Sequence, residues 1–131
     1  MVLSLNHGKG VNALCQALVA QLSQCLSDIY ADNSLRVLIM RSTVSGVFCA
    51  GADLKERAFM ADPEIEAFVA KLKSIADGIA DIPVPTIVAM DGAAIGGGLE
   101  FALAADIRVV SDNVKLGLSE TKLAIIPGAG I

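Results

Sequence analysis

An alternation of short apolar runs with longer segments of helical periodicity is the feature of this sequence that most constrains its fold. The runs at 37–40 and 86–90 are short and continuous, which is typical of strands buried in a parallel sheet. Further strands are expected at 2–5 and 107–110. With a helix in each interval, the order β-α-β-α-β-α-β predicts an α/β fold with a parallel sheet and helices packed on it. Such a fold binds its ligand beyond the carboxyl ends of the strands.

Three helices are expected between these strands. The first spans 12–30, with Asn12 as its N-cap and leucines recurring at helical spacing. The second runs over 62–82 with Pro63 at its first position, where the missing proline N–H has no helical partner to lose. The third runs from about 99 to 105 and follows a run of glycines.

Composition limits the classes of function. A chain of 131 residues with 54% apolar and 18% charged residues fits one domain with a buried core. A net charge of -4 and ten dispersed basic residues argue against a nucleic-acid surface. Charged residues interrupt every long apolar run, so no membrane span is expected. Cys15, Cys25 and Cys49 are odd in number and lack metal-ligand spacing, so we interpret them as reduced structural thiols and expect no metal.

Two loops rich in small residues, 48–55 and 91–100, each follow a predicted strand and present main-chain N–H groups to a ligand. Each feature also has a simpler interpretation. Glycines 96–98 alone fit a turn at a helix start, and their spacing matches neither nucleotide-binding glycine motif. Glu100 alone would complement a helix dipole, and Glu120 alone would be a surface loop residue.

The two loops together carry a resemblance. The first contains A-G-A-D at 50–53, and the second reads D-G-x-A-x-G-G-G-x-E at 91–100. This pair resembles the crotonase, or enoyl-CoA hydratase/isomerase, superfamily, and the likeness runs through essentially the whole chain. It implies a partial crotonase-like domain over 1–131 with a ββα spiral core. It also implies that a C-terminal helical part, which closes the acyl pocket and packs trimers or hexamers, is missing from this chain.

The resemblance assigns roles to four residues. The N–H groups of Ala52 and Gly97 form an oxyanion hole for the thioester carbonyl oxygen, where enolate charge develops. Glu100 orients and activates a water molecule, and Glu120 donates the α-proton. Isomerases, decarboxylases and dehalogenases of the superfamily usually keep one of these carboxylates or move it. Two glutamates therefore favour addition of water to an enoyl-CoA.

The resemblance also places the acyl-CoA against seven residues, namely Ala50, Ala52, Asp53, Leu54, Lys55, Gly96 and Gly97. Lys55 is equally consistent with a solvated surface charge. Coenzyme A is part of the substrate, so no separate cofactor is expected.

Segments 48–57 and 120–127 most resemble methylglutaconyl-CoA hydratases, which also bind AU-rich RNA. That branch implies the mitochondrial matrix, or the cytoplasm in a bacterium. RNA binding there depends on a lysine-rich first helix, and 12–30 contains neither Lys nor Arg, so no nucleic-acid partner is expected. The alternatives are a non-catalytic subunit that assembles with full-length chains, enoyl-CoA isomerisation, and, less favoured, an RNA-binding module.

Overall fold

The structure is a computed structural model that describes residues 1–7, 9, 11–123 and 125–129. Its strands are β1 (Val2–Leu5), β2 (Leu38–Ser42), β3 (Val47–Cys49), β4 (Thr86–Met90), β5 (Ala93–Ile95), β6 (Ile107–Val110) and β7 (Leu116–Gly117). Its helices are α1 (Gln16–Ala31), α2 (Leu54–Arg57), α3 (Asp62–Ala80) and α4 (Gly97–Ala104), with a 3₁₀ helix, η1, at Ser119–Leu123. None of the helices in these described ranges is long and apolar enough to cross a membrane.

The predicted strands form one parallel sheet in the order β1-β2-β4-β6. β1, β4 and β6 have the bounds expected from the sequence, and β2 is shifted by one residue at its start and two at its end. The register joins Val2, Ile39, Ile87 and Ile107 in one row across the sheet. The α/β class and the parallel arrangement are therefore confirmed.

A second parallel sheet, in the order β3-β5-β7, lies in segments that the sequence indicated only as loops and turns. Each of its strands follows a strand of the first sheet along the chain. The prediction of a single sheet is therefore wrong, because the described chain forms two. The order strand–strand–helix matches the expected ββα core. Strands of two or three residues are too short to show a periodicity of their own, which is why the apolar pattern missed them.

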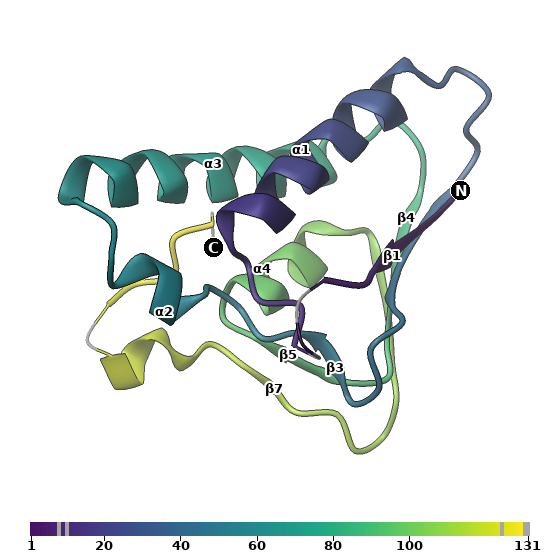
Figure 1. Ribbon diagram of the computed structural model, residues 1–131. Helices are drawn as coiled ribbons and strands as arrows, with labels where there is room; N and C mark the ends of the chain where they lie inside the picture. The colour runs from purple at the N-terminus through teal and green to yellow at the C-terminus, as the bar shows by residue number, and fades with distance from the viewer. Residues whose placement is uncertain (8, 10, 124, 130–131) are drawn as a thin grey trace.

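The core is built from the helices and from strands of both sheets. α3 packs against both α1 and α4, and Figure 1 shows α1 and α3 extending across the top of the molecule above α4. The apolar stripe of α3 buries Leu72, Ile75 and Ile79 as its periodicity predicts. Its start is fixed by the proline in its first turn and by Glu64, whose carboxylate accepts the Ala61 N–H at 2.8 Å.

The predicted N-cap at Asn12 is wrong, because α1 begins at Gln16 after Cys15. Asn12 has φ of 47°, a left-handed conformation that asparagine tolerates better than most residues, and it is fully buried. Its amide donates to Ser42 Oγ at 2.9 Å and to the Phe48 carbonyl at 3.0 Å, and it accepts the His7 N–H at 2.7 Å. Asn12 therefore fastens the loop before α1 to β2 and β3.

Candidate functional site

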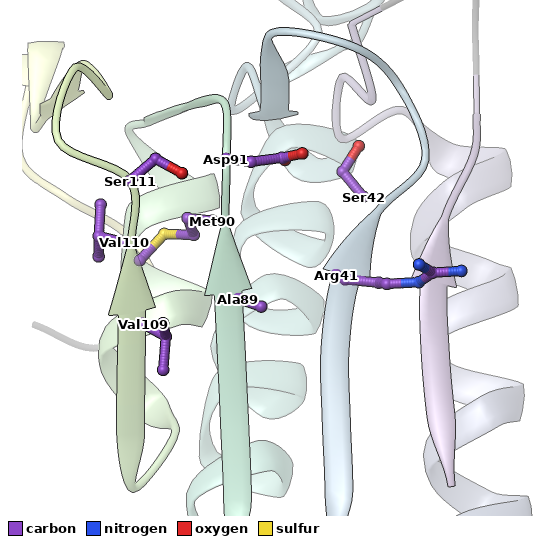
Figure 2. Close-up of a pocket in the computed structure, with 8 residues that line it drawn as sticks. All are labelled: Arg41, Ser42, Ala89, Met90, Asp91, Val109, Val110 and Ser111. Carbon is purple, nitrogen blue, oxygen red and sulfur yellow. The ribbon is translucent and has the colours of Figure 1, made fainter.

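One pocket lies beyond the carboxyl ends of the first sheet, where the fold class predicts a ligand. It measures about 250 Å³ and is lined by residues 41–42, 89–91 and 109–111. Figure 2 shows that the Arg41 side chain points toward β1, in agreement with its hydrogen bond to Ser4 Oγ at 3.2 Å. No site residue predicted from the sequence lines this pocket.

A larger cavity of about 630 Å³ lies beyond the carboxyl ends of the second sheet. Residues 50–52 follow β3, Gly96 and Gly97 follow β5, and Ser119 and Glu120 follow β7, and all of them line this cavity. Because parallel strands end at the same edge, these three segments converge. The expected position of a site, beyond the carboxyl ends of parallel strands, is therefore found at the second sheet, which the sequence did not predict.

The structure brings most of the predicted site residues together. Those that line the larger cavity are Ala50, Ala52, Leu54, Gly96, Gly97, Glu100 and Glu120. Asp53 and Lys55 do not line it. Asp53 is instead the N-cap of α2, where its carboxylate accepts the N–H groups of Lys55 and Glu56 at 3.0 and 3.1 Å. Lys55 is exposed.

The local fold sets the direction of two main-chain N–H groups at the cavity, those of Ala52 and Gly97. Leu14 donates to the Gly51 carbonyl at 2.8 Å and accepts from Asp53 N at 3.3 Å, so it forms a parallel bridge with Ala52. In such a bridge the residue between the two bonded ones, here Ala52, points its own N–H away from Leu14. Gly97 is the first residue of α4, and N–H groups in the first turn of a helix have no acceptor within the helix.

The two loops that carry these groups are in close contact. A Cβ on Gly51 would lie 2.7 Å from the Ile95 carbonyl oxygen and 3.5 Å from Gly97 N. Gly51 also has φ of 83°, in the region that favours glycine. Glycine at this position therefore lets the Ala52 loop lie directly against the start of α4.

Glu120 is buried beside Gly96, although its sequence context alone fitted a surface loop. It lies in η1 and is 9% exposed. A Cβ on Gly96 would lie 2.8 Å from its Oε1. Its Oε2 is buried and has no hydrogen-bond partner among the described residues. Because buried polar atoms are normally paired, this oxygen is unusual.

Glu100 lies near the next glycine, Gly97. It is 3% exposed in α4, and its Oε2 lies 3.8 Å from the position of a Cβ on Gly97. Its Oε1 accepts the Ala129 N–H at 2.9 Å. Since Gly96 and Gly97 are successive residues, the two carboxylates flank one short stretch of main chain.

The sequence did not assign several other residues of the cavity wall, which include Arg57 of α2, Val69 and Leu72 of α3, and residues 125–129. The helical periodicity and apolar character of Val69 and Leu72 indicate packing residues of α3, and only the cavity shows that they also line a candidate site. Within the described ranges, no cluster of three or more His, Cys, Asp or Glu side chains could hold a metal ion.

Comparison with known proteins places these features in context. The family model described as "Enoyl-CoA hydratase/isomerase" matches residues 1–131. The mitochondrial methylglutaconyl-CoA hydratase of Mus musculus is 54% identical over 130 residues, which cover 99% of this chain and 41% of that protein. The mitochondrial enoyl-CoA hydratase domain-containing protein 2 of Bos taurus is 50% identical over 126 residues, covering 96% of this chain and 43% of that protein.

A solved structure agrees with these matches. The crystal structure of an enoyl-CoA hydratase from Bacillus anthracis superimposes with a TM-score of 0.92 at 41% identity, covering 98% of this chain and 50% of that one. The chain thus spans about two-fifths of the length of the curated relatives and about half of this solved chain.

Proposed function

This chain belongs to the enoyl-CoA hydratase/isomerase family, and from that premise we propose that it adds water across the double bond of an α,β-unsaturated acyl-CoA thioester. One observation carries the proposal. Two buried carboxylates, from Glu100 and Glu120, flank the glycine start of α4 at a cavity that also receives the Ala52 loop. A reaction that needs an acid, a base and main-chain donors fits this combination.

The N–H groups of Ala52 and Gly97 serve in this proposal as the oxyanion hole. Attack of water at the β-carbon moves electrons onto the thioester oxygen, and two fixed N–H donors stabilise the enolate that results. The Gly97 donor also benefits from the partial positive charge at the start of α4. The segment 50–55 and Gly96 are proposed to hold the acyl-CoA.

The two glutamates divide the proton transfers. Glu100 accepts a proton from the attacking water as its oxygen bonds to the β-carbon, and the Ala129 N–H holds this carboxylate in place. Glu120 gives its proton to the α-carbon as the enolate collapses, and its Oε2, which has no hydrogen-bond partner among the described residues, is the oxygen assigned to that contact. Transfer of a proton from Glu100 back to Glu120, directly or through water, restores the starting state.

The relatives guide the remaining parts of the proposal. Proteins named as mitochondrial methylglutaconyl-CoA and enoyl-CoA hydratases are among them, so we propose an enoyl-CoA or methylglutaconyl-CoA substrate and a mitochondrial location. Coenzyme A enters as part of the substrate. A homotrimer or hexamer is the proposed assembly of the whole protein.

Replacement of Glu120 tests the proposal. We expect Glu120→Gln to lower hydration of an enoyl-CoA by about 10²–10⁴-fold, the usual contribution of a positioned general acid. Loss of the absorbance of the conjugated thioester measures the rate. Glu66→Gln is the matched control, because Glu66 is exposed on α3 and outside the cavity. Turnover by Glu120→Gln equal to that of the control would refute the assignment.

A non-catalytic subunit is the second candidate, and an exposed apolar side chain outside the cavity favours it. Phe59 is 91% exposed, and exposed apolar surface is a common place of contact with another subunit. Sedimentation of the purified chain, combined with the absorbance assay, separates the two functions. A chain that hydrates enoyl-CoA without another partner excludes the non-catalytic role, whereas an inactive chain that assembles only with a full-length relative supports it.

A further inference from the structure

The structure separates three cysteines that the sequence did not distinguish. Cys49 is buried, and its thiol donates to the Asn12 carbonyl at 3.1 Å. Cys25 is partly exposed within α1. Cys15 is also partly exposed, but it is the N-cap of α1, and its Sγ lies 3.1 Å from Nε2 of His7. A nucleophile and a base therefore lie in hydrogen-bond contact outside the larger cavity.

The contact between Cys15 and His7 is the arrangement that activates a thiol. A free cysteine is only a few per cent ionised at neutral pH, and its thiolate is the form that attacks. When the His7 imidazole takes the thiol proton, an imidazolium and a thiolate remain paired at the same contact. The sulfur also lies at the start of a helix of 16 residues, where the partial positive charge favours an anion.

The charged groups around Cys15 act in opposite directions. Glu56 of α2 accepts the Gln16 N–H at 2.8 Å, so a negative charge lies at the same helix start and opposes a second anion there. Lys9 is exposed in the loop between His7 and α1 and adds a positive charge. Among the described residues, His7 is the side chain that forms a hydrogen bond with the sulfur. The imidazole is therefore the group that decides whether the thiolate forms.

The electrophile that fits this thiol is a disulfide from outside the chain. All three cysteines are free. Cys25 lies about 15 Å further along the axis of α1, whereas the two Cα atoms of a disulfide are within roughly 7 Å of each other. Cys49 is held in the core by its own hydrogen bond. A disulfide at Cys15 therefore takes its second sulfur from a small external molecule, and the exposed Lys9 favours one that carries carboxylates.

We propose that Cys15 is a site of reversible modification by low-molecular-weight disulfides, activated by His7. The imidazole takes the thiol proton, and the Cys15 thiolate attacks one sulfur of the disulfide. The new sulfur–sulfur bond forms as the old one breaks, and the departing thiolate takes the proton from the imidazolium. The Cys15 sulfur is thereby oxidised, and one external thiol is released in reduced form. This activity goes beyond the proposed function and does not depend on it.

Exposure of the whole chain to glutathione disulfide at neutral pH tests the proposal. Mass spectrometry of the peptides gives the rate of mixed-disulfide formation at each cysteine, with Cys25 as the internal reference for a partly exposed thiol without a base. His7→Asn removes the base and keeps a polar side chain. Lys9→Gln is the matched control, because it removes a charge from the same loop and leaves the imidazole in place. Cys49 reports on folding, since a buried thiol reacts only when the core opens.

We expect Cys15 to form the mixed disulfide about tenfold faster than Cys25, because a larger thiolate fraction outweighs the partial loss of nucleophilicity. His7→Asn should remove this advantage, and Lys9→Gln should keep most of it. Equal rates at the two cysteines of the unaltered chain would overturn the proposal. An equal loss in Lys9→Gln would do so as well, because it would assign the effect to the general positive charge of the loop.

A second variant keeps the test decisive if the first one does not fold. Reaction of Cys49 in His7→Asn would show that the core has opened, and His7→Gln then takes its place. A folded variant of either kind that still modifies Cys15 as fast as the unaltered chain would show that the imidazole does not activate the thiol, and the inference would be wrong.

Discussion

Replacement of Gly96 by alanine probes the packing that sets the Glu120 carboxylate beside the start of α4. Gly96 has φ of 52° and ψ of -127°, a conformation that side chains rarely adopt. A Cβ at this position would lie 2.8 Å from Glu120 Oε1, well short of the 3.4 Å at which ordinary contact begins. Glu120 lines the cavity, so its carboxylate must turn aside to admit a methyl group at Gly96.

The expected cost has two parts. A residue forced into a sparsely populated backbone region loses roughly 1–3 kcal/mol. Overpacking of a buried contact adds about 1–3 kcal/mol. We therefore expect Gly96→Ala to lower the free energy of unfolding by about 2–6 kcal/mol in total.

Urea denaturation measures this free energy, and a second glycine supplies the control. Gly46 also has a positive φ, of 74°, but no atom lies within 4 Å of its Cβ position. Gly46→Ala should therefore show a backbone cost without a clash at the new Cβ.

A double-mutant cycle completes this experiment. In a Glu120→Ala background the contact is absent, so Gly96→Ala should then cost about as much as Gly46→Ala. Equal losses for Gly96→Ala with and without the Glu120 carboxylate would show that the two residues do not touch, and the geometry proposed for the site would fail.

Three further outcomes are expected. Asn12→Ala should lower the free energy of unfolding by about 2–4 kcal/mol in urea, because it leaves several buried donors and acceptors unpaired; a loss under 0.5 kcal/mol would contradict this. Hydrogen bonds from the main chain and side chain of Thr86 lower the pKa of Asp106 below 3.8. Its stabilising effect is therefore present above the unfolded-state pKa and is lost as pH falls through the lower folded-state value, so acid unfolding curves of Asp106→Asn should be shallower in that range. Burial raises the pKa of the Cys49 thiol to about 11, so an alkylating reagent at neutral pH should label Cys15 and Cys25 first and Cys49 only on unfolding, as mass spectrometry of labelled peptides would show.

Local sequence signals were enough for the first sheet and its helices. The run at 86–90 became β4 without change, and the proline-started helix became α3, ending two residues before the expected limit. The glycine loop and the A-G-A-D loop indicated where a ligand would meet main-chain N–H groups, and both line one cavity. These features depend on periodicity, turn chemistry and caps, which act between residues close together in the chain.

The Asn12 error shows where local signals fail. An asparagine before an apolar helical pattern is a good N-cap, but here hydrogen bonds to Ser42 and Phe48 outweigh that preference. Those partners lie 30 and 36 residues further along the chain, so no short window of sequence could reveal them.

The sequence by itself therefore determined the α/β class, the three longest helices and the two loops that line the cavity. Only the tertiary structure decided that the shortest strands form a second sheet, that Glu120 is buried, and that Arg57 faces the same cavity. The physical reason is the range of the interactions. The periodicity of helices and strands is set by residues that are close together in the chain. The pairing of very short strands and the burial of a charged side chain depend on distant segments that meet only when the chain has folded.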